Sequence, residues 1–196
     1  MHQANGRFAK SGSDDITSEP WPIAAVDLSR VDPRFLRQEV SYVSKYSLGI
    51  VVVDPNERFL YLVQQNNRAL RYGVGVGKVE AFNFQGEATI AAKKEWPGWR
   101  PTDNMIAREP DRYGPLRDGI PGGPNNPLGP RALYLFRDGY DTFYRLHGTV
   151  EPHTIGTMVS SGCVRLFNQD IIDLYNRVPV GTKAVVLPAR ARGEVA

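Results

Sequence analysis

Glycine and proline interrupt this chain so often that they constrain its fold more than any other feature. The 196 residues include 19 glycines and 15 prolines, a content that favours turns and short strands over long helices. Residues 108–131 alone hold six prolines and five glycines in 24 residues. A loop of that length inside a compact domain is usually functional, so we expect it to do more than connect its neighbours.

Most of the remaining chain has the pattern of β-strands. Residues 49–54 form a β-branched run, residues 59–64 alternate, and Pro55-Asn56 between them supplies the turn of a hairpin. Further strands are expected within residues 70–76, 86–99, 132–136, 143–148 and 182–187. The predicted class is therefore mainly β.

One convincing helix is predicted after residue 167. Asn168 is a plausible N-cap, and Ile171, Leu174 and Tyr175 fall on one helical face. The helix is expected to end before Pro179.

The composition indicates one domain with flanking segments. Residues 1–19 are polar and Gly/Ser-rich, which predicts a disordered tail. Residues 20–37 carry spaced apolar residues and are expected to form an extended arm with a short turn at Asp32-Pro33. Residues 38–190 are long enough for one well-buried domain, and 191–196 form a second polar tail.

Charge and cysteine content argue against several classes of protein. The net charge is +3 and the basic residues are scattered, so no nucleic-acid partner is expected. A single cysteine excludes an intramolecular disulfide framework and any multi-cysteine metal site. No apolar run approaches the roughly 18 residues of a transmembrane helix, and the first twenty residues lack the core of a secretory signal. Either a cytosolic protein or one whose export signal has been removed fits this pattern.

The segment VGVGK, residues 74–78, does not match the phosphate-binding motifs that it superficially suggests. A Walker A motif would need glycine at Tyr72 and serine or threonine at Val79, and the dinucleotide motif would need glycine at Lys78. Alternating glycines instead indicate a strand with one face kept bare for close packing.

The histidines do not make a persuasive metal site. They are His2, His147 and His153. His147, His153 and Cys163 could in principle supply three ligands, but a glycine and a proline interrupt the stretch between the histidines, and zinc sites favour tighter spacings. We expect no metal and no organic cofactor.

Cys163 is the only cysteine and lies in the hexapeptide SSGCVR, residues 160–165. A cysteine nucleophile reacts as a thiolate and needs a lowered pKa or a neighbouring base. The small residues before it would let a substrate carbonyl approach, and the N–H groups of Gly162 and Cys163 could hold an oxyanion. His147, 16 residues upstream, is the candidate base. These residues favour a Cys–His pair but leave a buried core cysteine open.

Residues 144–187 resemble the catalytic core of the L,D-transpeptidases, bacterial cell-wall enzymes with a cysteine nucleophile. The resemblance rests on HGT at residues 147–149, SSGCVR, a polar residue that opens a helix, and VPVGT at residues 178–182. Residues 93–105 and 122–135 also look like family segments, so the likeness covers roughly residues 38–188 in consistent order.

The resemblance implies a fold and a domain. The fold would be mainly β, an L,D-transpeptidase-type β-sandwich with one prominent helix after the cysteine and a Pro/Gly-rich lid loop around residues 122–130. Residues 38–190 would be the catalytic domain.

The resemblance also implies roles for single residues. Cys163 would be the nucleophile, His147 would take the thiol proton, and the backbone carbonyl of Gly148 would orient the imidazole. Gly162 and Cys163 would supply the oxyanion N–H groups.

Other positions are implied to lie near the substrate. Ser160, Ser161 and Arg165 would contribute to substrate binding, with Ser161 standing where many members carry a second histidine. Arg165 would hold a substrate carboxylate or form a structural salt bridge behind the cysteine. His153 would be a loop residue that touches substrate without acting as a catalyst.

The implied reaction is acyl transfer at a peptidoglycan stem tetrapeptide in the periplasm or cell envelope. D-Alanine would leave, and the acyl group would pass to an amine of a neighbouring stem, of an envelope protein or lipoprotein, or of a free D-amino acid. Such an enzyme would serve peptidoglycan biosynthesis, cell-wall organisation and cell shape, and carbapenems would acylate it. A hydrolase on the same scaffold and a non-catalytic wall-binding module remain alternatives.

Overall fold

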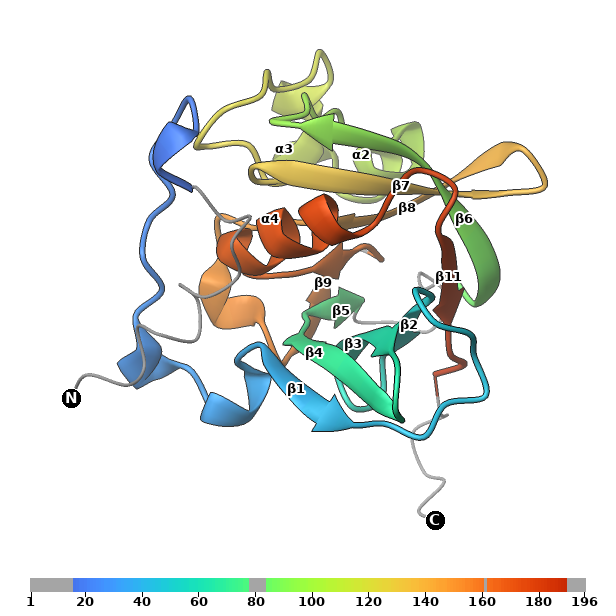
Figure 1. Ribbon diagram of the computed structural model, residues 1–196. Helices are drawn as coiled ribbons and strands as arrows, with labels where there is room; N and C mark the ends of the chain where they lie inside the picture. The colour runs from blue at the N-terminus through green and yellow to red at the C-terminus, as the bar shows by residue number, and fades with distance from the viewer. Residues whose placement is uncertain (1–15, 78–83, 161, 190–196) are drawn as a thin grey trace.

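A nine-stranded sheet is the largest element of the described structure (Figure 1). The computed structural model describes residues 16–77, 84–160 and 162–189. The large sheet has the order β1-β4-β3-β2-β11-β6-β7-β8-β10, and β5 pairs with β9. The strands are β1 Gln38–Ser41, β2 Val51–Asp54, β3 Phe59–Gln64, β4 Arg68–Gly73, β5 Val76–Gly77, β6 Gly86–Glu95, β7 Arg131–Arg137, β8 Tyr140–His147, β9 Met158–Ser160, β10 Val164–Arg165 and β11 Lys183–Val186. The mainly β class is confirmed.

Within the described residues the helices are short and α4 is the prominent one, as predicted. The α-helices are α2 Asp103–Arg108, α3 Pro110–Tyr113 and α4 Asn168–Arg177. The 3-10 turns are η1 Ile16–Ser18, η2 Leu28–Arg30, η3 Pro33–Phe35, η5 Gly114–Leu116 and η6 Pro152–Thr154. In Figure 1, α4 lies between the β6–β7–β8 part of the sheet and the part that holds β3 and β4.

The apolar pattern of the chain explains which strands are central. Val51, Val52 and Val53 are fully buried because β2 lies between β3 and β11 and is covered on both faces. The buried cluster continues through Leu133 and Leu135 on β7. The hairpin predicted from residues 49–54 and 59–64 is thus confirmed as β2 and β3, and the structure shows that β2 is a central strand.

Gly75, which lies between β4 and β5, links this part of the chain to β10. It forms a two-way backbone bridge with Arg165 of β10, with N···O distances of 2.9 and 2.8 Å. A Cβ at Gly75 would lie 2.6 Å from the carbonyl oxygen of Thr154, and one at Gly73 would meet the backbone of Phe35. The close packing predicted for the alternating glycines is confirmed at these two positions. They do not belong to one continuous strand, because β4 ends at Gly73 and β5 begins at Val76. Lys78 and Val79 lie outside the described residues.

Helix α4 confirms most of the prediction but not its cap. Ile171 and Leu174 are fully buried, and the helix ends at Arg177 before Pro179. The residue that caps the N-terminus is Phe167, and no side chain caps it. The prediction of Asn168 as N-cap is wrong because its side chain accepts a hydrogen bond from another segment, described below.

The N-terminal arm packs on the domain through turns and buried contacts. Asp32 caps η3 by accepting a hydrogen bond from Arg34 N–H, which places a turn at Asp32-Pro33 as predicted. Phe35 is buried, and Arg37 forms an ion pair with Asp173 of α4 at 2.8 Å. The arm therefore contributes to the core.

Glu19 fastens the start of the arm to the sheet. The composition placed residues 16–19 in a disordered tail, but in the structure residues 16–18 form η1. Glu19 forms a buried ion pair with Arg131. Trp96 Nε1 also donates to Glu19 at 2.7 Å, and Trp21 packs edge-on against Trp96. Residues 1–15 and 190–196 lie outside the described residues.

The Pro/Gly-rich loop is more structured than its sequence suggested. It contains α3 and η5, and α2 ends at its first residue; the sequence predicted none of these elements. Asn126 is 1% exposed, and its amide nitrogen donates to the carbonyl oxygens of Ile120 and Pro121. Leu128, Gly129 and Pro130 are buried as well. That residues 122–130 cover the substrate stays a prediction.

Replacing Glu19 tests the attachment of the arm. Glu19→Ala leaves the Arg131 guanidinium buried without its partner, since both side chains are at most 7% exposed. We expect the free energy of unfolding, measured with urea, to fall by roughly 3–5 kcal/mol. The matched control is Glu39→Ala, which removes an exposed ion pair with Arg68 and should cost at most about 1 kcal/mol. Equal losses in the two variants would contradict the arm's role.

Candidate active site

Pairing between β8 and β10 brings the two predicted halves of the site together. The strands are parallel, with Leu146 opposite Val164 and His147 opposite Arg165. Leu166 N–H also donates to the carbonyl oxygen of His147 at 2.8 Å. His147 is the last residue of β8, and Cys163 comes directly before β10. Cys163 therefore directly precedes the strand that pairs with the end of β8, although 16 residues separate it from His147 in sequence.

The ring of His147 is held in one tautomer. Its Nδ1 lies 2.6 Å from the carbonyl oxygen of Gly148. Because a carbonyl oxygen only accepts hydrogen bonds, Nδ1 carries the proton and Nε2 is the basic nitrogen. Burial, and next the charge of Arg165, lowers the pKa of His147 from 6.5 to about 3. The imidazole is therefore neutral at neutral pH.

The turn that carries Gly148 is fastened by Asn168. The Asn168 side-chain oxygen accepts a hydrogen bond from Thr149 N–H at 2.8 Å. A Cβ on Gly148 would collide with that oxygen and would lie 2.8 Å from Pro130 Cδ. Sequence reasoning missed Asn168 as a site residue because a polar residue before an apolar helical pattern usually indicates an N-cap.

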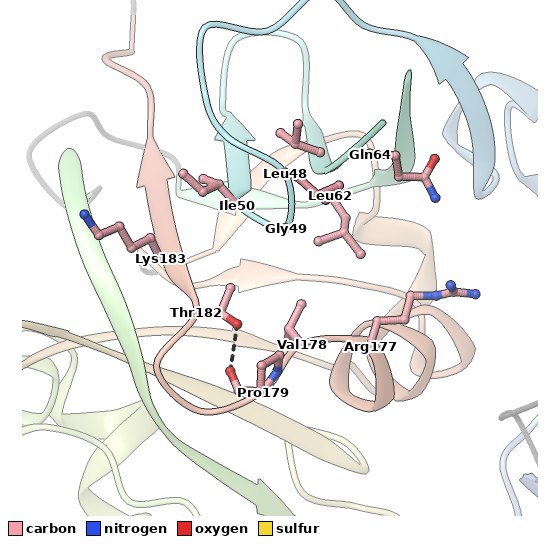
Figure 2. A pocket seen from close by; sticks show the side chains of 11 residues that line it. Leu48, Gly49, Ile50, Leu62, Gln64, Arg177, Val178, Pro179, Thr182 and Lys183 are labelled. Carbon is pink, nitrogen blue, oxygen red and sulfur yellow. Dashed lines mark hydrogen bonds between the residues drawn. The ribbon is translucent and has the colours of Figure 1, made fainter. Parts of the chain in front are cut away.

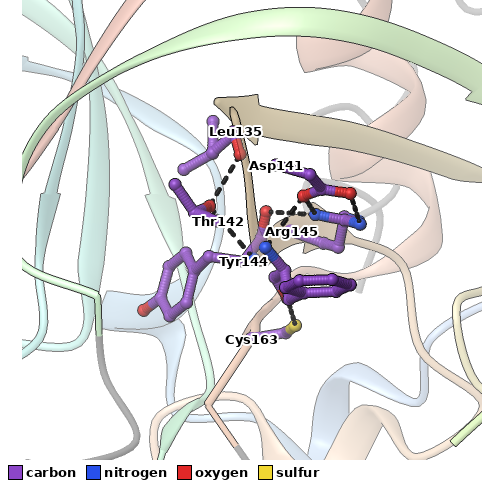
Figure 3. Close-up of polar contacts among 7 residues, drawn as sticks. Leu135, Asp141, Thr142, Tyr144, Arg145 and Cys163 are labelled. Carbon is purple, nitrogen blue, oxygen red and sulfur yellow. Dashed lines mark hydrogen bonds and ion pairs between the residues drawn. The ribbon is translucent and has the colours of Figure 1, made fainter. Parts of the chain in front are cut away.

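Cys163 carries a half-buried thiol that forms no disulfide. Its Sγ donates to the carbonyl oxygen of Phe143 on β8 at 3.8 Å (Figure 3). Burial raises the pKa of the thiol, while the backbone N–H of Arg145 and the charges of Arg145 and Arg165 oppose that shift. At neutral pH a protonated thiol therefore lies beside a strand that ends in a neutral histidine.

The turn before Cys163 requires glycine. Gly162 has φ of +134°, a conformation that side chains rarely adopt. Ser160 is the last residue of β9, and Ser161 lies outside the described residues. Oxyanion binding by the N–H groups of Gly162 and Cys163, and substrate binding by the two serines, stay predictions.

Arg165 forms the salt bridge that the sequence left open. Its Nη1 lies 2.7 Å from Glu151 and 3.4 Å from Thr154 Oγ1. The Arg165 side chain is 17% exposed and that of Glu151 is 46% exposed. His153 is an exposed residue of the turn η6 between these two partners. Contact of Arg165 or His153 with substrate stays a prediction.

Sequence reasoning also missed the residues that face the thiol from β8. Asp141 and Arg145 form a two-point ion pair at 2.7 Å, and Phe143 has φ of +58°. The predicted strand began at residue 143, whereas β8 begins at Tyr140. The sequence Asp141-Thr142 could have indicated an irregular strand here, because Asp and Thr side chains often form hydrogen bonds with the backbone two residues further along.

A separate hollow lies away from these residues. Its volume is about 420 Å³, and apolar side chains that include Leu48, Ile50, Val178 and Pro179 line it (Figure 2). None of the predicted site residues belongs to its lining. Within residues 16–77, 84–160 and 162–189, no three His, Cys, Asp or Glu side chains gather as a metal site would require.

The L,D-transpeptidase catalytic-domain model, YkuD, matches residues 49–186. This chain belongs to the L,D-transpeptidase family. The match begins within the segment before β2 and ends with β11, so it includes β8, β10 and α4. The recognition made from HGT and SSGCVR is confirmed.

Relatives in the L,D-transpeptidase family cover a large part of the chain. Probable L,D-transpeptidase YbiS of Escherichia coli is 36% identical over 149 residues, which are 74% of this chain and 47% of that protein. Probable L,D-transpeptidase ErfK/SrfK of Escherichia coli is 35% identical over 140 residues, 71% of this chain and 44% of that protein. The chain spans about half the length of these curated relatives.

Solved structures share the fold. A Brucella melitensis protein described as a probable carnitine operon oxidoreductase is 52% identical, with a TM-score of 0.55, covering 82% of this chain and 99% of that one. An L,D-transpeptidase from Mycobacterium smegmatis is 19% identical, with a TM-score of 0.51, covering 70% of this chain and 57% of that one. No helix in the described part of the chain is long and apolar enough to cross a membrane.

Gly148→Ala tests the turn that orients His147. The added Cβ would lie 2.8 Å from Pro130 Cδ and against Asn168, so the turn must shift. We expect the free energy of unfolding to fall by roughly 1–3 kcal/mol. Gly114→Ala is the control, because Gly114 has helical φ and a Cβ added there would meet no atom within 4 Å. A Gly148→Ala variant as stable as Gly114→Ala would contradict the tight turn.

The buried neutral His147 predicts how stability changes with pH. The pKa of His147 in the folded protein, about 3, lies below the ordinary value of 6.5. Between pH 3 and 6.5 the unfolded chain therefore binds a proton at His147 that the folded chain does not bind. This contribution to stability is complete above pH 6.5 and is lost progressively as pH falls toward 3. Urea unfolding at pH 7 and 4.5 should show a larger loss for the wild type than for His147→Gln. Equal losses would mean that His147 titrates normally.

Proposed function

We propose that this protein is an L,D-transpeptidase that acts on peptidoglycan stem peptides through a thioester on Cys163. The observation that carries the proposal is the 2.6 Å contact between His147 Nδ1 and the Gly148 carbonyl. That contact leaves Nε2 as a neutral base on the strand beside the cysteine. It supports a Cys–His pair oriented by a backbone carbonyl, with no Asp or Asn partner required.

The first half of the reaction forms the thioester. Cys163 Sγ attacks the carbonyl carbon of the L-centre in the donor stem, and His147 Nε2 takes the thiol proton. The N–H groups of Gly162 and Cys163 hold the oxygen of the tetrahedral intermediate. The bond to the D-centre breaks, and His147 returns the proton to the departing amine of D-alanine.

The protonation states suit this order of events. Burial keeps both groups neutral at rest, because it raises the pKa of Cys163 and lowers that of His147. Proton transfer then accompanies attack, and a separated thiolate and imidazolium need not exist in the free protein. The Arg145 N–H and two guanidinium charges favour the thiolate once it forms.

The second half transfers the acyl group to an amine. The acceptor amine attacks the thioester carbonyl, gives its proton to His147, and Cys163 leaves as the thiol. The acceptor is a diamino-acid side chain of a neighbouring stem, an envelope protein or lipoprotein amine, or a free D-amino acid. Because this substrate lies outside the cytoplasmic membrane, the proposed location is the periplasm or cell envelope.

Arg165 is assigned a supporting role in this proposal. Its pairing with Glu151 at 2.7 Å supports a scaffold function beside the cysteine. Its charge also contributes to the pKa of His147 and of Cys163. A donor carboxylate could contact Arg165 only by sharing it with the half-exposed Glu151. Ser160 and Ser161 are proposed to line the donor site.

Cys163→Ala tests the nucleophile. The variant lacks the sulfur that forms the acyl bond, so we expect no turnover of purified muropeptides by mass spectrometry. In the wild type, a 3→3 dimer supports transpeptidation, and loss of terminal D-alanine without a dimer supports the hydrolase instead. A carbapenem should add one adduct mass to the wild type and none to Cys163→Ala. A Cys163→Ala variant that still turned over would refute the proposed nucleophile.

A further inference from the structure

We propose that a bulge in β8, held by Asp141 and Thr142, positions the Cys163 thiol through the main-chain carbonyl of Phe143. The proposal rests on the function proposed above, since it assigns positioning residues to the same reaction. Asp141 and Thr142 do not contact the reacting atoms themselves. They act through the backbone of Phe143, whose carbonyl oxygen accepts from Cys163 Sγ at 3.8 Å.

The bulge is visible in the pairing of β7 with β8. Tyr134 lies opposite Arg145 and Phe136 lies opposite Asp141. One residue of β7 between these pairs, Leu135, therefore faces three residues of β8, 142–144. Bulges of this kind bend a strand and redirect its backbone groups, and they are over-represented next to active sites.

Side chains of the bulge satisfy its own backbone. Thr142 Oγ1 donates to the Leu135 carbonyl at 2.6 Å and accepts from Tyr144 N–H at 3.2 Å. Asp141 Oδ1 accepts from Phe143 N–H at 2.8 Å. Figure 3 shows these contacts grouped on the strand above Cys163. The two extra residues are thus held by specific hydrogen bonds.

Phe143 adopts a conformation that its own side chain does not stabilise. Its φ is +58°, the left-handed region that bulky residues rarely enter. Its side chain is 70% exposed, so core packing of the ring does not offset the strain. A strained backbone conformation of this kind persists only where contacts with neighbouring residues enforce it, and such conformations are common at functional sites. The surroundings here are the hydrogen bonds of Asp141 and Thr142.

Arg145 completes the arrangement on the far side of the bulge. Its guanidinium forms two contacts of 2.7 Å with Asp141 and stacks 4.2 Å over the ring of Tyr134. Its backbone N–H faces the sulfur and favours the thiolate. One bulge therefore presents an acceptor for the thiol, from Phe143, and a donor for the thiolate, from Arg145.

Asp141 also sets the charge near the sulfur. Although burial opposes it, hydrogen bonds from Arg145 and Phe143 keep the pKa of Asp141 below its ordinary value. The charged carboxylate offsets the Arg145 guanidinium and raises the pKa of Cys163. The titratable and charged groups around the thiol are Asp141, Tyr144, Arg145 and His147 on β8, Tyr134 on β7 and Arg165 on β10.

Asp141→Asn in the full chain tests this role. The variant removes the ion pair and the negative charge but keeps the size of the side chain. Acyl transfer from muropeptides should slow by roughly 10- to 100-fold in kcat with little change in KM, because the sulfur is less well placed. Alkylation of Cys163 by iodoacetamide should instead reach half its maximal rate at lower pH, since the thiolate forms more readily. Because burial raises the pKa of the thiol, a loosened fold would also lower that midpoint. Urea unfolding therefore has to show that Asp141→Asn is as stable as the wild type.

Asp138→Asn is the matched control. Asp138 lies between β7 and β8, also has positive φ, and loses the same charge, but it is not among the groups that shift Cys163. Its variant should keep the wild-type kcat and alkylation midpoint. If Asp141→Asn behaves like Asp138→Asn in both measurements, the positioning role is overturned. A wild-type chain that is alkylated normally but does not turn over muropeptides would overturn the proposed reaction alone.

Two substitutions at Phe143 separate the backbone from the ring. Glycine accepts the left-handed conformation, whereas β-branched valine opposes it, and both remove the aromatic ring. We expect kcat of Phe143→Val to lie at least about tenfold below that of Phe143→Gly. Equal losses would assign the effect to the ring and overturn the bulge as the positioning element. Urea unfolding checks that both variants are folded.

Discussion

The site depends on the parallel pairing of β8 with β10. These strands are joined in sequence by the short elements η6 and β9, and β10 has only two residues. Two neighbours hold this short strand: β8 pairs with it along one edge, and Gly75 forms a backbone bridge with Arg165 along the other. The absence of a side chain at Gly75 lets that bridge form against Thr154. The bridge at Gly75 therefore helps to hold the strand that follows Cys163.

Burial then sets the chemistry that this placement allows. The buried imidazole and the half-buried thiol both prefer their neutral forms, because desolvation penalises charge. The Gly148 carbonyl selects the tautomer of His147 without adding a charge, which an Asp partner would do. Backbone groups also interact with the sulfur of Cys163: the Phe143 carbonyl accepts from the thiol, and the Arg145 N–H favours the thiolate. The site is thus organised largely by main-chain atoms.

Segments far from the site in sequence keep that main chain in place. Asn168 at the start of α4 bonds Thr149 in the HGT turn, and α4 is in turn paired to Arg37 of the arm. The end of the Pro/Gly-rich loop packs against the same turn, since Gly129 and Pro130 lie beside Gly148. The arm, the loop and the helix therefore support one histidine, although none of their residues reacts.

The sequence by itself determined the class of fold, the hairpin of β2 and β3, the helix after the cysteine, and the association of HGT with SSGCVR. Each of these follows from local patterns, such as the β-branched run of β2 or a motif of fixed spacing. Only the tertiary structure decided that Asn168 bonds Thr149 instead of capping α4, that Arg165 pairs with Glu151, and that Asp141 bonds the Phe143 N–H within a bulge of β8. These contacts join separate strands, turns and helices, or depend on the register between strands. A local pattern cannot specify them, because the geometry that decides each one exists only when the sheet has closed.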